Sequence, residues 1–400
     1  MLTFDEARAK VLSHVTPLGH ERVPLFRALF RVLAREVRAH SPFPPFAASA
    51  MDGYAVAISA FDGALPLTLP VVGESRTGGL APKLSPRTAC RIFTGAELPE
   101  GADAVVLQED VKREGDQVTF ASVPARGANI RRAGEDLAAG DRAIEAGTRL
   151  SPFQLSLAAS LDVAELVVAA RPRVTIVSTG DELRSPGEPA HKGSIPESNS
   201  IGLAALAESA GAVVSVAPLV GDDREATERA IADALARSDL LVTVGGVSVG
   251  DHDLVRPALE RAGVTLDFWK VAIKPGKPLA LGSAGRTHVL ALPGNPASSL
   301  TTFSLFGMPL LRALQGDRRP LPLTTRLPLA ADVSHKTGRL EFQRARLIEQ
   351  EGRLTVSTLA NQASGAVTSM GWAEALAMIP ADLETLARGE LVEVLRLADV

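Results

Sequence analysis

The most constraining feature of this chain is the alternation of short apolar strands with helical segments between Arg171 and about Gly316. The expected strands are 174–178, 213–220, 239–244 and 288–293. Each is followed by a segment with helical spacing, and parallel strands need such a crossover in order to pair. The pattern therefore predicts a parallel sheet covered by helices. Ligands of such sheets bind outside the carboxyl ends of the strands, so the loops there are the first candidates for a site.

The loop after the third strand carries the strongest local signal. The segment 242–253 reads VTVGGVSVGDHD, so a buried strand breaks at a glycine pair and the loop ends in acids before a helix. Glycines let backbone N–H groups approach a phosphate or a pterin, and a helix N-terminus favours an anion. Carboxylates would repel a bare phosphate, which suggests a metal ion between acid and anion. The candidates here are Gly245, Gly246, Ser248, Gly250 and Asp253.

The loops after the other strands contribute further polar residues. STGDEL places Glu182 behind the first strand, and the GDD run places Asp222 behind the second. Each of these loops by itself also fits an ordinary turn that caps a helix. The PGNP run at 293–296 likewise fits a tight turn with Pro296 at the first helical position. Additional candidates for substrate binding are Ser178, Thr179, Pro293, Gly294, Asn295 and Ser298.

A basic loop follows the glycine-rich one. WKVAIKPGKP at 269–278 holds Lys270, Lys274 and Lys277, and its prolines stiffen the chain. Lysines held in this way make point-charge contacts to phosphate, whereas a solvated basic loop is the alternative.

Composition narrows the classes of function. The chain has 42 basic and 46 acidic residues, a net charge of −4, and no basic patch of the kind that captures nucleic acid. Its one cysteine, Cys90, excludes an internal disulfide and a cysteine-based zinc site, and fits a reducing compartment. No apolar stretch is long enough to span a bilayer. We therefore expect a soluble cytoplasmic protein that binds neither nucleic acid nor membrane.

The remainder of the 400 residues is expected to form further domains. Thr3 and Glu6 make a capping box that starts a helix, and the apolar spacing over 25–33 predicts a second helix that ends before Ser41. Helical spacing returns within 140–170. The expected domains are an elongated helical domain (1–41 and 140–170), an inserted β-rich domain (42–139), an α/β domain (171–318) and a C-terminal β domain (319–400).

The inserted domain carries three polar motifs, each an ordinary turn when taken alone. They are SAMDGYAV at 49–56, RIFTGAELPEGADAVV at 91–106 and NIRRAGED at 129–136. Their candidate functional residues are Asp52, Thr94, Arg131 and Asp136.

Taken together and in this order, these segments resemble the molybdopterin molybdenumtransferase family of the MoeA type. The resemblance extends over almost the whole chain and includes LPGNPASS, LEFQRARL and ASGAVTSM. It implies the four-part architecture given above and an elongated homodimer, in which the inserted domain of one subunit faces the α/β domain of the other. It also implies insertion of molybdenum from molybdate into adenylylated molybdopterin, with Mg²⁺-dependent release of AMP. A molybdopterin adenylyltransferase is the implied upstream partner.

The resemblance assigns roles to particular residues. The catalytic acids and threonine of the family fall on Asp52, Thr94, Asp136, Glu182, Asp222 and Asp253. Within this set, Glu182, Asp222 and Asp253 are our candidates for holding Mg²⁺, because Mg²⁺ prefers carboxylate oxygens. Lysines and glycine amides would orient the pyrophosphate. The chain departs from the family pattern at Ala47–Ala48 and at Glu374–Ala375.

Two other interpretations stay open from the sequence. One is a non-catalytic pterin-binding or scaffold dimer. The other is a hydrolase of a different nucleotide or pterin pyrophosphate that uses the same α/β domain.

Overall fold

The computed structural model of the chain describes residues 1–13, 15–246, 254–350 and 352–399. Its centre is a six-stranded sheet in the order β16-β13-β17-β21-β20-β18. The first four strands are parallel, β20 runs antiparallel to β21, and β18 runs antiparallel to β20. These strands are β13 (Arg173–Ser178), β16 (Val213–Val216), β17 (Leu240–Val244), β18 (Thr265–Trp269), β20 (Ala280–Ala284) and β21 (Thr287–Leu292). The predicted parallel sheet is confirmed, with an antiparallel extension.

Helices cover both faces of this sheet because its middle strands are apolar on both sides. In β17, Leu240 and Val242 pack in one cluster with α1, α3 and α7, whereas Leu241 packs in another with α4 and α5. Such two-sided burial is typical of parallel strands. The helices are α1 (Phe4–Ser13), α3 (Asn199–Ser209), α4 (Arg224–Arg237), α5 (Val255–Arg261), α6 (Pro296–Thr302) and α7 (Met308–Leu314), with a π-helical turn at Phe303–Gly307.

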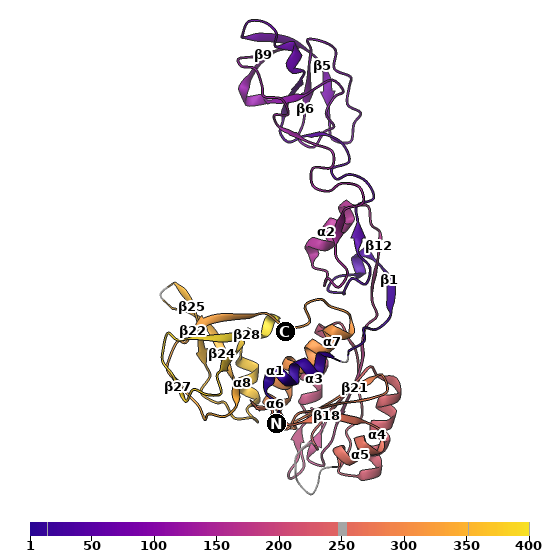
Figure 1. Ribbon diagram of the computed structural model, residues 1–400, viewed down its shortest axis with the longest axis vertical. Helices are drawn as coiled ribbons and strands as arrows, with labels where there is room; N and C mark the ends of the chain where they lie inside the picture. Colours follow the sequence, from indigo (N-terminus) through magenta and orange to yellow (C-terminus); the bar gives the residue numbers. More distant parts are fainter. Residues whose placement is uncertain (14, 247–253, 351, 400) are drawn as a thin grey trace.

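The predicted capping box of α1 is present. The Thr3 N–H donates to Glu6 Oε2 at 2.8 Å, and the Glu6 N–H donates to Thr3 Oγ1 at 3.3 Å. Phe4 of this helix then packs against Phe306 and Phe342 with ring centroids 5.6 and 5.1 Å away. The helix therefore lies on the central domain, apart from the rest of the N-terminal unit (Figure 1).

The N-terminal unit has mixed structure rather than two helices. It contains β1 (His20–Pro24), a 3₁₀ turn (Leu25–Arg27), β2 (Val37–Arg38), β11 (Arg142–Ile144), α2 (Pro152–Ser160) and β12 (Glu165–Ala169). The helix predicted over 25–33 is wrong. The Leu25 N–H donates to Ala164 O and the Leu33 N–H to Thr148 O, so pairing with the returning chain outweighs the local helical spacing. The helix predicted within 140–170 is confirmed as α2, with a capping box at Ser151.

The inserted domain lies at the far end of the molecule and is built on a six-stranded sheet, order β7-β4-β6-β5-β9-β8 (Figure 1). Its strands are β3 (Ala48–Ser49), β4 (Gly53–Val56), β5 (Leu67–Ser75), β6 (Ala89–Ile92), β7 (Ala104–Leu107), β8 (Val111–Glu114), β9 (Gln117–Phe120) and β10 (Ile130–Arg131), with 3₁₀ turns at Ile58–Ala60 and Gln108–Asp110. Cys90 is buried in it, and burial raises the pKa of its thiol to about 11.

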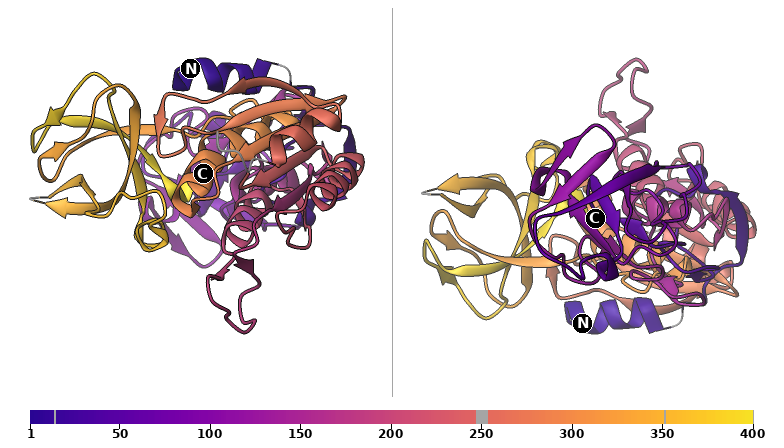
Figure 2. Two further views of the ribbon diagram at one scale, coloured as in Figure 1. Left: turned by 90° about the horizontal axis from the view of Figure 1, so that it is seen from below. Right: turned by 90° about the horizontal axis from the view of Figure 1, so that it is seen from above.

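The C-terminal domain is a second β structure, order β19-β24-β26-β28-β22, and lies to one side of the central domain (Figure 2). Its elements are β19 (Ile273–Lys274), β22 (Thr324–Pro328), β23 (Val333–Ser334), β24 (Leu340–Gln350), β25 (Arg353–Thr358), α8 (Val367–Trp372), β26 (Ala375–Ile379), β27 (Thr385–Leu386), β28 (Leu391–Arg396) and a 3₁₀ turn (Leu397–Asp399). Strand β19 comes from the basic loop, so that loop joins the two domains.

Candidate functional site

Three parallel strands end side by side and define the candidate site. The register pairs Ser178 at the end of β13 with Val244 of β17, and Val244 with Leu292 of β21. The segments that follow these strands therefore leave the sheet at one edge. They line a cavity of about 510 Å³, which we call the carboxyl-edge cavity.

Eight of the residues proposed from the sequence line this cavity. They are Thr179, Glu182, Asp222, Gly245, Gly246, Pro293, Gly294 and Asn295. Three others, Ser248, Gly250 and Asp253, lie outside the described residues. The β–loop–helix pattern thus brings together residues that are more than 100 positions apart in the sequence.

The acidic residues that follow β13 and β16 have different structural roles. Asp223 is the N-cap of α4, since its Oδ1 accepts from the Ala226 N–H at 2.7 Å. Asp181 Oδ1 accepts from the Asp222 N–H at 2.8 Å and so fixes the turn. The side chains of Glu182 and Asp222 line the cavity, and within the described parts of the chain neither carboxylate has a hydrogen-bond or ion-pair partner. These two acids are the ones available to a ligand.

Two glycines are required by the geometry of this edge. Gly246 has φ +62°, and a Cβ added there would lie 2.4 Å from Val255 Cγ2. Gly180 has φ +149°, and its added Cβ would lie 2.4 Å from Glu182 Oε2. Only a glycine lets these turns form while the Glu182 carboxylate stays against the backbone. The amide of Gly245, which we expected to face an anion, instead donates to Leu292 O at 3.2 Å.

Ser178 and Ser298 lie outside the lining of the carboxyl-edge cavity. Ser178 is buried, and its hydroxyl donates to Glu197 Oε1 at 3.4 Å. Ser298 is buried within α6, and its carbonyl accepts from the Thr302 hydroxyl at 2.8 Å.

Sequence reasoning missed Glu197 and Asn199, which line the cavity. Glu197 is only 4% exposed and accepts from the Ser200 N–H at 2.9 Å. Asn199 donates through Nδ2 to Gly294 O at 2.8 Å and accepts from the Ser299 hydroxyl at 3.1 Å, which ties α3 to the PGNP loop. The only local signal was an acidic residue beside a helix start, which an ordinary cap also explains.

The basic loop lies beside the cavity but does not place its lysines in the lining. Pro278 lines the cavity, whereas Lys270, Lys274 and Lys277 do not. Lys274 instead forms an ion pair with the buried Glu341 at 2.9 Å. Glu341 also contacts His335 Nδ1 at 3.1 Å. Part of the positive charge expected at the site is thus already balanced within the C-terminal domain.

The polar motifs of the inserted domain lie beside one another, since the Gly95 N–H donates to Ser49 O and the Ala50 N–H donates to Asn129 O. Asp52 Oδ1 accepts from both the backbone N–H and the hydroxyl of Thr94, each at 2.8 Å. These bonds, the backbone one first, hold the pKa of Asp52 below its ordinary value. Arg131 Nη2 pairs with Asp136 Oδ2 at 2.6 Å, and Arg131 lies opposite Ala48 in the β3–β10 pair. Ala48 thus serves as a backbone partner of the motif strand.

Within one chain this second cluster lies far from the carboxyl-edge cavity. The N-terminal unit separates the inserted domain from the central sheet (Figure 1). Asp52, Thr94, Arg131 and Asp136 therefore do not reach Glu182 and Asp222 of their own chain. Among the described residues, no group of three or more His, Cys, Asp or Glu side chains is placed to hold a metal ion.

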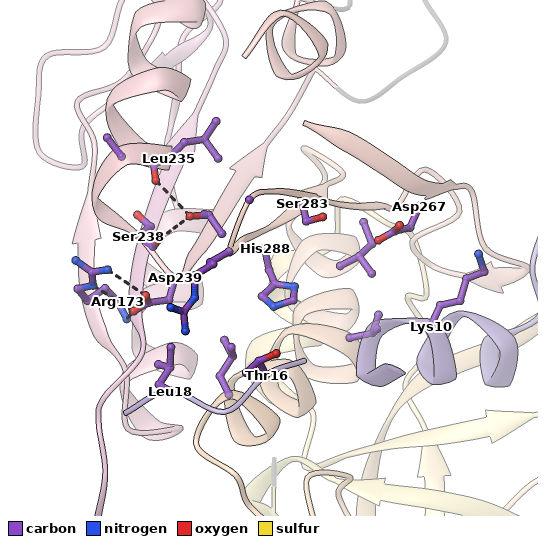
Figure 3. A pocket seen from close by; sticks show the side chains of 17 residues that line it. Lys10, Thr16, Leu18, Arg173, Leu235, Ser238, Asp239, Asp267, Ser283 and His288 are labelled. Atoms are coloured by element: carbon purple, nitrogen blue, oxygen red, sulfur yellow. Dashed lines mark hydrogen bonds and ion pairs between the residues drawn. The ribbon is translucent and has the colours of Figure 1, made fainter. Parts of the chain in front are cut away.

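The opposite edge of the central sheet carries a larger cavity, of about 680 Å³, which we call the amino-edge cavity (Figure 3). None of the residues proposed from the sequence lines it. Its charged groups include Arg173 and Asp239, which are joined by two side-chain hydrogen bonds of 3.2 and 3.0 Å.

Comparison with known proteins identifies the family. Residues 2–161 match the MoeA N-terminal region (domain I and II), residues 175–313 match a domain described as "Probable molybdopterin binding domain", and residues 326–397 match the MoeA C-terminal region (domain IV). The chain is 37% identical to the molybdopterin molybdenumtransferase of Haemophilus influenzae over 98% of both chains. The chain belongs to the molybdopterin molybdenumtransferase family.

Two further proteins support this family assignment. The chain is 40% identical to molybdopterin molybdenumtransferase 2 of Mycobacterium tuberculosis over 93% of this chain and 94% of the relative. The crystal structure of a molybdopterin biosynthesis protein, MoeA, from Pyrococcus horikoshii superposes with a TM-score of 0.86 at 29% identity, covering 99% of this chain and 100% of the other. The resemblance inferred from the motifs and the four-part fold are therefore confirmed. In the described parts of the chain, no helix is long and apolar enough to cross a membrane.

Proposed function

We propose that this protein transfers molybdenum from molybdate into molybdopterin, and that its substrate is the adenylylated form, from which AMP is released. The observation that carries the proposal is the pair of carboxylates Glu182 and Asp222, which have no partner among the described residues and lie beside glycine turns at the carboxyl edge of the sheet. A molybdopterin adenylyltransferase would supply this substrate.

Mg²⁺ fits this edge. Glu182 and Asp222 both line the cavity, and Mg²⁺ in proteins is commonly held by one or two carboxylates together with substrate phosphates and water. We propose these two acids as its ligands, with Asp253 as a third. When bound, the ion would neutralise charge on the pyrophosphate.

The chain's own residues would position the rest of the substrate. The turns at Gly180 and Gly246 bring the backbone close to the ligand, and Asp181 holds the Asp222 turn in place. Asn199 and Gly294 shape the far wall of the cavity. The neighbouring basic loop carries Lys270, Lys274 and Lys277. These lysines would contact the negatively charged groups of the ligand at the edge of the cavity.

We further propose that the working unit is a homodimer. The cluster of Asp52, Thr94, Arg131 and Asp136 is separated from the carboxyl-edge cavity of its own chain (Figure 1). The inserted domain of a second subunit would bring this cluster to the carboxyl-edge cavity. Thr94 and Arg131 would there contact molybdate or the pterin.

The test is AMP release from adenylylated molybdopterin with Mg²⁺, measured with and without molybdate. Release by the wild type should depend on molybdate. Asp222→Asn should lower the rate on the order of 100-fold or more, because it removes a charged ligand of the proposed Mg²⁺, and should leave the thermal unfolding midpoint unchanged.

Asp223→Ala is the matched control one residue away. It should keep turnover within about twofold, while loss of the N-cap lowers the free energy of unfolding by about 1 kcal/mol. Normal release by Asp222→Asn would remove Asp222 from the site. Release that ignores molybdate would favour a pyrophosphate hydrolase, and binding without turnover would favour a scaffold.

A further inference from the structure

A third cavity, of about 480 Å³, is lined by residues of the N-terminal unit, of α7 and of the 3₁₀ turn at Leu397–Asp399. We call it the junction cavity. Its charged lining residues are Arg149, Arg312, Arg318, Arg319, Asp317 and Asp399. Four positive charges against two negative ones leave an excess of two positive charges, 4 minus 2. None of these residues belongs to the motifs described above.

Arg312 is the central feature of the junction cavity. It is only 7% exposed, and its Nη2 donates to Asp399 O at 3.1 Å. Its Nε is a buried donor that has no acceptor among the described residues. Burial, and then the positive charge of Arg149, lowers the pKa of Arg312 to about 10. A buried donor without a partner costs stability, so an acceptor in the cavity would stabilise this arrangement.

Arg149, which comes from the N-terminal unit, also has a buried nitrogen that makes no hydrogen bond among the described residues. This nitrogen is Nη2, which lies 3.3 Å from Asp317 Oδ2. Asp317 Oδ1 accepts from the backbone N–H of Arg319 at 2.9 Å. The Asp317 carboxylate therefore faces the Arg149 guanidinium through Oδ2 alone and leaves the Arg319 side chain unpaired within the described residues.

The remaining arginines differ in availability. Arg318 pairs with Glu145, and its N–H donates to Gly147 O at 3.0 Å, so it is held at the backbone junction. The side chain of Arg319 is exposed and lines the cavity. Arg149, Arg312 and Arg319 are thus the groups that can turn to a ligand.

We propose that the junction cavity binds a dianionic oxyanion of the phosphate type, held by Arg149, Arg312 and Arg319. Guanidinium groups bind such oxyanions through paired, charge-assisted hydrogen bonds. Arg149 belongs to the N-terminal unit and Arg312 to α7 of the central domain, so the bound anion links the two. It would thereby stabilise the position of the N-terminal unit, which carries the inserted domain. The ligand is either inorganic phosphate or the phosphate group of a small metabolite.

Calorimetric titration of the full chain with inorganic phosphate, at constant ionic strength, tests the proposal. Arg319→Gln changes an exposed side chain and should fold normally, and it should weaken phosphate binding about tenfold. Arg312→Lys keeps the charge but removes the fork, and should weaken binding similarly. Arg113→Gln, the same substitution on the exposed strand β8, is the control and should bind as the wild type does.

Two results would overturn the proposal. One is the absence of phosphate binding by the wild type. The other is binding that is unchanged in Arg319→Gln and Arg312→Lys but lost in Lys274→Gln, which would place the phosphate near the carboxyl edge of the sheet. Glycerol 2-phosphate separates the two sources: tighter binding than that of phosphate indicates a phosphorylated metabolite, and weaker binding indicates free phosphate.

The junction cavity is independent of the proposed function. Arg319→Gln, assayed without phosphate, should release AMP at the wild-type rate if that function holds. Phosphate should raise the thermal unfolding midpoint of the wild type by a few degrees and that of Arg319→Gln by less, since only the folded chain binds it.

Discussion

The two edges of the central sheet both carry polar cavities, but their charges are arranged differently. At the amino edge, Asp239 receives two side-chain hydrogen bonds from Arg173, and the Thr287 hydroxyl donates to Ser238 O at 2.8 Å (Figure 3). At the carboxyl edge, Glu182 and Asp222 have no side-chain partner within the described residues. The amino-edge cavity is the larger, at about 680 Å³ against about 510 Å³. The amino-edge cavity also holds Lys10, Asp267 and Arg286, whose side chains have no hydrogen-bond or ion-pair partner within the described residues either. The candidate site is therefore distinguished by its two acids beside glycine turns at the carboxyl ends of the parallel strands, and not by its volume.

The strongest test of this comparison replaces one carboxylate by the corresponding amide at each edge of the sheet. Glu182→Gln should lower the rate of AMP release on the order of 100-fold and leave stability unchanged. Asp239→Asn should do the opposite, keeping turnover and lowering the free energy of unfolding by about 1 kcal/mol through its weakened bonds to Arg173. Urea unfolding and the AMP assay on both variants measure the two effects. Equal effects of the two changes on turnover would break the comparison.

Glycines at the two edges offer a second test. Gly246→Ala adds a Cβ 2.4 Å from Val255 Cγ2 at φ +62°, and should lower the free energy of unfolding by about 3 kcal/mol. Gly285 at the amino edge has φ +60° but nothing within 4 Å of an added Cβ. Gly285→Ala should therefore cost only about 1 kcal/mol from backbone strain. Chemical denaturation compares them, and a Gly246→Ala protein as stable as Gly285→Ala would show that the carboxyl-edge turn can relax.

The Arg173–Asp239 pair predicts a pH dependence. Burial acts to raise the pKa of Asp239, but the hydrogen bonds and charge of Arg173 outweigh it, so this pKa is lowered. The stabilisation is therefore present above the pKa of Asp239 in the unfolded chain and is lost as the pH falls through its pKa in the folded chain. Arg173 is more than half exposed, so solvent screening limits the pair to about 1 kcal/mol.

Denaturant unfolding of Arg173→Gln and the wild type measures this stabilisation. The difference in the free energy of unfolding should be present at neutral pH and vanish at strongly acidic pH. Arg229→Gln on α4 removes an exposed pair with Glu225 and is the control, with an expected change of about 0.3 kcal/mol. A difference between wild type and Arg173→Gln that persists in acid would mean that Arg173 acts through packing.

The smallest expected effect concerns Asp52 in the inserted domain, a partly exposed residue whose carboxylate accepts two hydrogen bonds from Thr94. Thr94→Ala removes the hydroxyl donor and keeps the backbone one, so the pKa of Asp52 should rise part of the way to its ordinary value. A ¹³C NMR titration of the Asp52 carboxyl carbon measures the change. An unaltered pKa would show that the Thr94 backbone N–H alone sets the charge of this group.

The sheet and its helices were largely predictable, because buried parallel strands and capped helices have local signatures. The run at 239–244 appears as β17, and the capping box at Thr3 starts α1. The helix predicted over 25–33 failed, since Leu25 and Leu33 pair their backbones with residues more than 100 positions away. Local spacing cannot show such long-range hydrogen bonds.

The position of the candidate site in the fold was predictable from the sequence, whereas the roles of its individual residues were less so. Loops after Ser178, Val244 and Leu292 had to meet once the strands were parallel. The resemblance selects Asp222 and not Asp223 as the functional acid, but the reason is visible only in the structure, where Asp223 caps α4 and Asp222 lines the cavity. The pairing of Lys274 with Glu341 also depends on residues from a different domain.

The sequence by itself determined the family, and it predicts the order of the domains and the edge of the sheet where a ligand would bind, since these follow from motifs and from strand–helix alternation. Only the tertiary structure decided which side chains remain without partners there. It assigned Asp223 to a helix, Asp181 to a turn and Ser178 to Glu197, and left Glu182 and Asp222 exposed to the cavity. Satisfying a polar group depends on its three-dimensional neighbours, and those neighbours come from distant parts of the chain.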